Sequence, residues 1–206
     1  MACSVLCVSH TTGSDGDEIG RRVAEQLGYL YVDEDIVARA AARGGLDPGD
    51  VADEERRKTY ARRILEALAE GGGDPVVLAA TAGIEVVSPA DIRALIRETV
   101  AQTAARGNVV IVAHAAAHAI EPGPRTLRVL VTASTATRAR RVAGAKQVDG
   151  AKAARTIKDS DAGRRDYLKR FYSVDAESPT DYDLVINTDV LSAEQAAEII
   201  LRAADR

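Results

Sequence analysis

The chain has 206 residues and a formal net charge of −4, from 27 Lys and Arg against 31 Asp and Glu. That length suits one compact α/β domain, and a hydrophobic content of 46% excludes wholesale disorder. Aromatic residues make up only 3%, without any Trp, which argues against a base-stacking surface. The mild acidity argues against a coat of nucleic acid, so we expect no nucleic-acid partner.

Cysteines and histidines are few. Cys3 and Cys7 cannot form a disulfide framework or a zinc ribbon, so we predict buried thiols in a reducing cytosol. The two lie four residues apart in an apolar run, which would place them on one face of a strand. His114 and His118 are also four residues apart, but no third metal ligand is evident, so no metal site is predicted. No apolar run approaches the roughly 18 residues needed to span a membrane, and we expect a cytoplasmic protein without a membrane partner.

Short β-rich runs alternate with longer helical patterns, which predicts an α/β fold with a largely parallel sheet. Strands are expected at 3–8, 109–112, 127–131 and 183–187, with a short apolar segment at 29–32 and a strand or buried turn at 76–80. Helices are expected at 17–27, 34–43, 54–70, 88–106, 134–142, 149–172 and 192–204. Gly28 is expected to end the first of these helices, and a capping box of Ser192 and Gln195 to begin the last.

A glycine-rich loop at 11–16 follows the first predicted strand and precedes the first helix. This order aims backbone N–H groups and the positive end of a helix at one point, which suits a phosphate. Gly13 and Gly16 would allow a close approach by the anion, and Ser14 could add a hydroxyl. The Walker lysine is absent, and carboxylates that would repel a phosphate without Mg²⁺ or arginines stand at Asp15, Asp17 and Glu18. A phosphate site and an ordinary glycine-rich turn both remain open.

Over most of its length the chain resembles the cytidylate kinase-like family of P-loop nucleoside monophosphate kinases. The block at 9–20 is similar to that family's shortened glycine loop, S-R-x-x-G-S-G-G-R-E-I, which also lacks the Walker lysine. The blocks at 27–37 and 109–116 resemble its second motif and its V-I-V-G-R-G-A motif. The blocks at 127–141 and 157–167 resemble a strand with an arginine-bearing lid helix and the second arm of the lid, and 182–189 resembles its Y-D-L-x-I-N-T-D strand.

The resemblance implies a single three-layer P-loop kinase-like domain over 1–206, with a five-stranded parallel sheet flanked by helices. A monophosphate-binding helical segment would lie at about 33–106 and a helical lid at about 138–172. The implied reaction is ATP-dependent phosphoryl transfer to a nucleoside monophosphate such as CMP or dCMP, with ATP and Mg²⁺ as cofactors of an active enzyme. The implied partner is a nucleotide or another phosphorylated small molecule, and a homo-oligomer is left open.

The resemblance also assigns roles to individual residues. On the donor side these are Ser9, His10, Gly13, Ser14, Gly16 and Asp17. Facing the acceptor are Asp33 and His114. The lid charges are Arg138, Arg141, Lys158 and Arg164, with Asp161 orienting them. Asp33 equally fits the N-cap of a helix, and Arg164 equally fits a solvated helix face.

The departures from the family fall on charged positions. His10 and His114 stand where the family has arginine, Asp17 replaces a basic residue, and Asp15 replaces a glycine. A charge-assisted bidentate contact is worth about 1.5–3 kcal/mol, and an imidazole that is mostly neutral does not supply it. A second hypothesis is therefore a catalytically inactive kinase-fold protein with a binding, regulatory or scaffold role. The strand at 182–187, which keeps the family pattern, is interpreted as packing.

The charge is unevenly distributed along the chain. Between Arg138 and Arg170 there are 11 Lys and Arg and 4 Asp and Glu, so this stretch carries +7 and the remainder −11. A basic lid set against an acidic body suits a segment that closes over phosphates. The carboxylates of the glycine loop lie on the acidic side, so the lid pattern favours a phosphate and the loop pattern does not.

Overall fold

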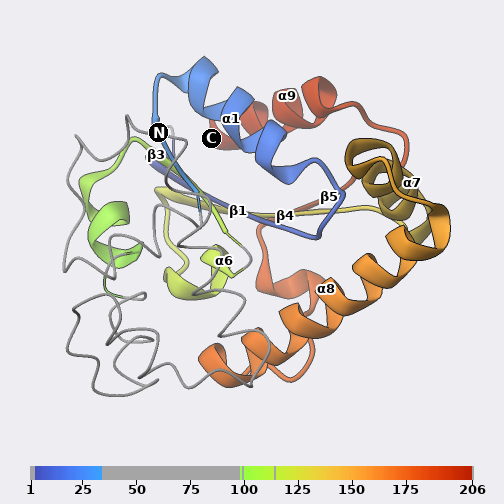
Figure 1. Cartoon of the computed structure of the whole chain (residues 1–206). Helices are drawn as coiled ribbons and strands as arrows, with labels where there is room; N and C mark the ends of the chain where they lie inside the picture. Colours follow the sequence, from blue (N-terminus) through green and yellow to red (C-terminus); the bar gives the residue numbers. More distant parts are fainter. Residues whose placement is uncertain (1–2, 34–97, 99, 114, 206) are drawn as a thin grey trace, which may run out of the picture.

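The computed structural model describes residues 3–33, 98, 100–113 and 115–205. Within these residues the centre is a five-stranded parallel sheet in the order β2-β3-β1-β4-β5 (Figure 1). The strands are β1 (Val5–His10), β2 (Leu30–Asp33), β3 (Val109–Val112), β4 (Thr126–Thr132) and β5 (Leu184–Asn187). The predicted fold class, a parallel sheet flanked by helices, is confirmed.

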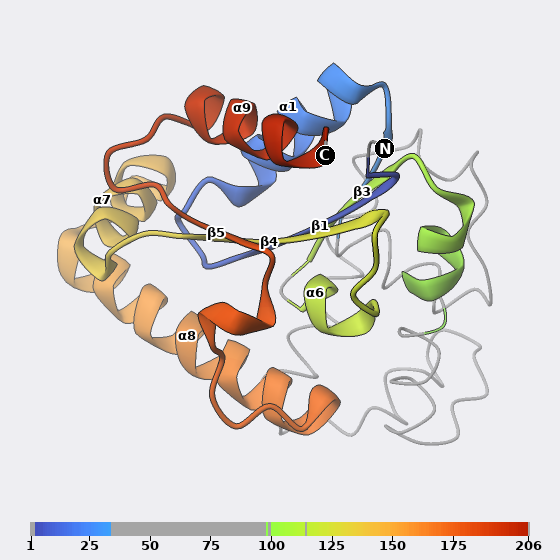
Figure 2. The same ribbon diagram turned by 180° about the vertical axis from the view of Figure 1, so that it is seen from behind.

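Helices cover both faces of the sheet. They are α1 (Gly16–Leu27), α6 (Ala116–Ala119), α7 (Thr135–Lys146), α8 (Gly150–Tyr172) and α9 (Ala193–Ala204). Figure 2 shows α1 and α9 on one face and α6 and α8 on the other, with α7 beyond the ends of the strands. Because side chains alternate along a strand, Leu6 and Val8 of β1 pack toward α1 and α9, whereas Val5 and Cys7 pack toward the opposite face. Buried strands of this kind explain the continuous apolar run of β3.

Capping residues mark the helix ends. The predicted capping box is present, because Ser192 and Gln195 exchange side-chain and backbone hydrogen bonds at the start of α9. Ser134 and Asp149 cap α7 and α8 with side-chain acceptors. Gly28 ends α1 in the left-handed conformation at φ 64°, as predicted.

The prediction that Cys3 and Cys7 share a strand face is wrong. β1 begins only at Val5, and Cys3 precedes it, where its N–H donates to the Ala204 carbonyl at 2.8 Å. Cys3 therefore packs in the cluster with α1 and α9, while Cys7 lies in the cluster on the other face. Both thiols are buried, and burial raises the pKa of Cys7 to about 12, which keeps that thiol protonated.

Some predictions fall on residues 34–97 or on His114, which lie outside the described residues. These include the helices at 34–43 and 54–70, the segment at 76–80 and most of the monophosphate-binding segment. The described end of the helix predicted at 88–106 is helical at 98 and 100–106. Two short elements were not predicted, α6 and the 3₁₀ helix Pro179–Asp181, because they are too short for a hydrophobic period. Of the helices in the described part of the chain, none combines the length and apolarity that crossing a bilayer requires.

The order in which the chain forms the strands points to one end of the sheet, where the carboxyl ends of β1 and β3 lie. From β1 the chain passes through α1 to β2, on one side, whereas from β3 it passes to β4, on the other side of β1. In open α/β sheets, ligands bind at such a switch point, outside the carboxyl ends of the strands. The glycine loop follows β1 at this end.

Candidate functional site

The backbone of the glycine loop leaves the start of α1 open. Gly13 has φ 81°, and Asp15, the N-cap of α1, has φ 65°. The Asp15 side chain makes no capping hydrogen bond, so the first amides of α1 have no acceptor from their own N-cap. Amides at the positive end of a twelve-residue helix suit an anion.

Both loop glycines are required by close packing. A Cβ on Gly13 would lie 2.8 Å from the carbonyl oxygen of Arg138, and a Cβ on Gly16 would lie 2.2 Å from the Cβ of His10. Real Cβ atoms do not approach neighbours this closely, so the loop fits against α7 and β1 only with glycine at these positions.

Gly16→Ala is expected to lower the free energy of unfolding by about 2–3 kcal/mol, because the new methyl group overlaps the fixed Cβ of His10. Gly144 is the control, since it lies inside α7 and a Cβ there would meet nothing within 4 Å. Gly144→Ala should raise stability by about 0.5–1 kcal/mol through its helix propensity. Urea denaturation measures both, and equal effects of the two variants would contradict the close packing at Gly16.

The predicted donor-side serines turn inward. The Ser14 hydroxyl donates to the carbonyls of Thr11 at 2.7 Å and Val131 at 3.0 Å. Ser9 is fully buried and its hydroxyl lies 3.5 Å from the amide of Ala117, on the α6 side of the sheet. These hydroxyls hold the loop and the strand from within, and the ligand-facing surface of the loop is therefore mainly backbone.

Each loop carboxylate lies beside a basic group. The pairs are Asp15–Arg141 (Oδ2 to Nε, 3.1 Å), Asp17–His10 (Oδ1 to Nε2, 3.5 Å) and Glu18–Arg22 (Oε1 to Nη2, 2.7 Å). The condition stated for a phosphate site, that arginines stand beside these carboxylates, is therefore met at Asp15 and Glu18. His10 and Asp17, which replace two basic residues of the family pattern, contact each other.

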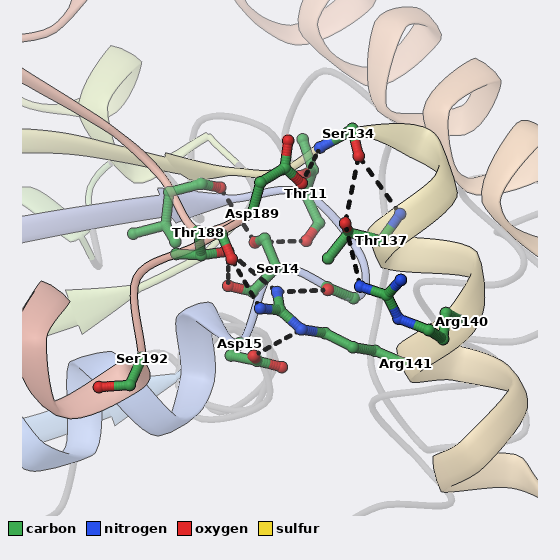
Figure 3. A network of polar contacts seen from close by, with 12 residues as sticks. Thr11, Ser14, Asp15, Ser134, Thr137, Arg140, Arg141, Thr188, Asp189 and Ser192 are labelled. Atoms are coloured by element: carbon green, nitrogen blue, oxygen red, sulfur yellow. Dashed lines mark hydrogen bonds and ion pairs between the residues drawn. The ribbon is translucent and has the colours of Figure 1, made fainter.

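Thr188 joins the loop to three elements (Figure 3). Its buried hydroxyl lies 3.1 Å from the Ser14 carbonyl and 3.2 Å from the Thr132 carbonyl, and donates to them. Arg141 of α7 donates through Nη1 to this hydroxyl at 2.9 Å and through Nη2 to the Thr188 carbonyl at 2.7 Å. A further Nη1 bond reaches the Gly13 carbonyl at 3.3 Å. The residue after β5 thus fixes both the loop and the lid arginine.

The strand interpreted as packing at 182–187 also carries a polar contact, through Asp183, and the two residues after it make further polar contacts. Thr188 makes the contacts above, and the Asp189 carboxylate accepts from the Ser134 amide at 2.9 Å, at the start of α7. Asp183 accepts from the backbone amide and the guanidinium of Arg128. For Thr188 and Asp189 the signal in the sequence was their position directly after β5, at the end of a parallel sheet where ligands usually bind, whereas Asp183 precedes that strand.

Arg138 joins α7 to α8, the two helices of the predicted lid segment. It is 5% exposed, and its Nη1 and Nη2 donate to the two carboxylate oxygens of Asp161 on α8 at 2.8 and 2.7 Å. Nη1 also lies 3.4 Å from the Thr12 carbonyl, and the Thr12 hydroxyl is 2.6 Å from that of Ser160. Lys158 is exposed on α8, and no bond links it to this group within the described residues.

Arg164 lies in a buried polar cluster and not on a solvated face. It is 7% exposed, it pairs with both oxygens of Glu177, and its Nη1 donates to the His10 carbonyl at 3.2 Å. The Tyr182 hydroxyl donates to Glu177 and lies 3.5 Å from His118 Nε2. Through Arg164 the cluster therefore holds the backbone carbonyl of His10, the last residue of β1.

Ionisation in this cluster follows from burial and pairing. Burial alone would raise the pKa of the Glu177 carboxyl, but the hydrogen bond and charge of Arg164 outweigh it and lower this pKa. Burial, helped by Glu177, raises the pKa of Tyr182. Burial also lowers the pKa of His118, so its imidazole stays neutral near pH 7. The cluster is an ion pair with neutral neighbours.

The acceptor side lies mostly elsewhere. Asp33 stands at the carboxyl end of β2, opposite Val112 of β3, and is partly exposed. β2 is separated from β1 by β3, so Asp33 ends a strand that is not adjacent to the one leading into the glycine loop. His114, the other predicted acceptor residue, lies outside the described residues. Among the residues that are described, there is no group of three or more His, Cys, Asp or Glu able to hold a metal by itself.

Comparisons with known proteins agree on one family. The sequence profile of the cytidylate kinase-like family matches residues 5–190. A cytidylate kinase from Aeropyrum pernix is 29% identical over 199 residues, which cover 97% of this chain and 98% of that protein.

Solved structures extend the likeness in fold. An uncharacterized protein from Eubacterium ventriosum has a TM-score of 0.66 at 16% identity, covering 98% of each chain. A shikimate kinase from Bacteroides thetaiotaomicron has a TM-score of 0.55 at 15% identity, also covering 98% of each chain. A shikimate kinase from Acinetobacter baumannii, in complex with shikimate, has a TM-score of 0.52 at 15% identity and covers 98% of this chain and 92% of that one. At these identities the likeness shows a shared kinase fold.

Proposed function

The chain belongs to the cytidylate kinase-like family, and on this premise we propose that it transfers the γ-phosphoryl group of ATP to a nucleoside monophosphate such as CMP or dCMP. The observation that carries the proposal is the open start of α1. Its N-cap provides no side-chain acceptor, it follows a glycine loop at the switch point of the sheet, and Arg141 lies beside it. This combination of amides and a guanidinium suits a polyphosphate.

The glycine loop fits the donor phosphates through its backbone amides, and it offers Mg²⁺ one exposed carboxylate, that of Asp17. The amides at Gly13, Gly16 and Asp17 would hold the donor phosphates, with Ser14 fixing the loop from inside. Mg²⁺ usually keeps several waters and binds phosphates plus one or two carboxylates, so the absence of a metal-binding cluster in the described part of the chain agrees with its use. Asp17, whose side chain is 57% exposed in the first turn of α1, is the carboxylate that would contact it. The bound metal would offset negative charge on the transferring group.

The basic residues of the proposed lid differ in how accessible they are to a bound phosphate, so we assign them different roles. Arg141 is closest to the loop and partly exposed, so it would contact the donor phosphates directly. Arg138 and Arg164 are buried in ion pairs and would hold α7, α8 and the loop in position. Lys158, on the exposed side of α8, would reach a phosphate after movement of the lid segment, which we place at about 138–172. Asp33 and His114 would face the acceptor, which the segment at about 33–106 would help to bind.

One observation favours a second candidate, a catalytically inactive binding or regulatory protein. Three lid arginines are engaged by the protein itself: Arg138 by Asp161, Arg141 by Asp15, and Arg164 by Glu177. If these pairs persist with a nucleotide present, the transferring group receives no guanidinium. The choice between the candidates therefore depends on turnover.

The test is ADP formation from Mg-ATP with CMP, dCMP, UMP or AMP, followed by ³¹P NMR. We expect turnover with a cytidine monophosphate and a rise in melting temperature with Mg-ATP concentration. Arg141→Ala should lower kcat/KM by about 100-fold or more, whereas Lys146→Ala, at the exposed end of α7, should change it less than about twofold. Absence of both ADP and a thermal shift at millimolar Mg-ATP would reject the kinase and leave the second candidate.

A further inference from the structure

The Asp15 carboxylate has an unusual place in the loop. It is the N-cap of α1 and has φ 65°, a conformation that is unfavourable for residues other than glycine, aspartate and asparagine. An N-cap aspartate ordinarily accepts a hydrogen bond from its own helix, but this one turns away and lies 3.1 Å from the Arg141 Nε. Its negative charge therefore pairs with an arginine of α7 and does not cap α1.

Arg141 is held in position without Asp15. Its Nη1 and Nη2 donate to the Thr188 hydroxyl, the Thr188 carbonyl and the Gly13 carbonyl, all of which are neutral. Asp15 faces only the Nε edge of the guanidinium, and it is the carboxylate paired with this arginine among the described residues (Figure 3). Removal of the carboxylate would leave a fixed guanidinium with an uncompensated charge beside the open start of α1.

We propose that Asp15 sets the affinity of the donor site: its carboxylate occupies the Arg141 edge that a polyphosphate would otherwise bind, so the polyphosphate must displace it. This inference rests on the proposed donor-phosphate site. A carboxylate and a phosphate oxygen compete for the same guanidinium hydrogens, and the carboxylate also repels an anion a few ångströms away. Wild-type affinity is therefore lower than the glycine loop and Arg141 alone would give.

The variants Asp15→Asn and Asp15→Gly test the proposal. Asparagine tolerates the positive φ and has nearly the same shape, and glycine removes the side chain and the backbone strain. Both should fold, because Asp15 and Arg141 are about one-third exposed and such pairs stabilise little. Glu18→Gln is the matched control, since it removes one negative charge from the same turn of α1, from a carboxylate paired with Arg22.

The measurement is calorimetric binding of tripolyphosphate with Mg²⁺ at low and at high salt. We expect Asp15→Asn to bind about tenfold more tightly than wild type, with less gain at high salt, and Glu18→Gln to bind within about twofold. Tighter binding by Asp15→Asn supports the inference even where the wild type fails to turn over CMP, so its outcome is separate from that of the proposed function. Equal or weaker binding by both Asp15 variants, or equal tightening by Glu18→Gln, would overturn it.

Discussion

Glu177→Ala is expected to lower the free energy of unfolding by about 3–5 kcal/mol, because it leaves the Arg164 guanidinium buried without its carboxylate. Arg164 is 7% exposed, and two other groups that accept from it, the His10 carbonyl and the Tyr182 hydroxyl, carry no charge. Removing one partner of a buried ion pair costs far more than the pair itself contributes. Urea denaturation followed by circular dichroism measures the loss.

Two further variants separate the burial of charge from simple loss of a contact. Asp175→Ala removes a carboxylate from the same loop, where its pair with Lys169 is exposed, and should cost less than about 1 kcal/mol. The double variant Arg164→Met with Glu177→Leu removes both charges and should be more stable than Glu177→Ala alone. A cost for Glu177→Ala no larger than that for Asp175→Ala would show that the cluster is not important for stability.

The same cluster predicts how stability depends on pH. Folding lowers the pKa values of both Glu177 and His118, so protonation of either group favours the unfolded state. Their contribution is present in full above about pH 6.5, the unfolded value of histidine, and decreases on acidification, first through His118 and then, below about pH 4.3, through Glu177. Glu177→Gln should remove the lower part of this dependence.

The local sequence determined most of the elements. β3 was predicted at 109–112 and lies at Val109–Val112, because four buried apolar residues after a glycine have few alternatives. Side-chain caps at Ser134, Asp149 and Ser192 mark the starts of three helices within a residue of the prediction. Cys3 was assigned to the wrong face because the periodicity of a strand holds only inside the strand, and β1 begins two residues later.

The site depended on contacts between distant parts of the chain, which periodicity does not report. His10 and Asp17, two substitutions that are unfavourable for a phosphate when taken singly, contact each other in the fold. Thr188 reaches Ser14 across 174 positions, so its role follows only from the order of the strands. Arg164 fitted a solvated helix face as well as a lid, until the fold placed Glu177 and Tyr182 against it.

A second buried pair, between Arg138 and Asp161, joins α7 to α8. Arg138 is 5% exposed and makes two bonds to the carboxylate, and its Nε, buried, has no hydrogen-bond partner among the described residues. The arginine therefore already lacks one of its hydrogen bonds, and Asp161 provides the charge that compensates it. The backbone of Arg138 also limits the space at Gly13, so this pair connects α8, α7 and the glycine loop.

Asp161→Ala should lower the free energy of unfolding by about 3–5 kcal/mol, since it leaves Arg138 buried and unpaired between α7 and α8. Because the pair joins these helices, hydrogen exchange should accelerate most in α7, α8 and the loop, and least in α9, which packs on the opposite face of the sheet. Asp159→Ala is the control on the same helix, where the exposed side chain should change stability by less than about 0.5 kcal/mol. Exchange that rises equally in α9 would mean that Asp161 stabilises the whole domain, whereas a selective rise in α7 and α8 would identify the pair as the connection between these two helices and the glycine loop.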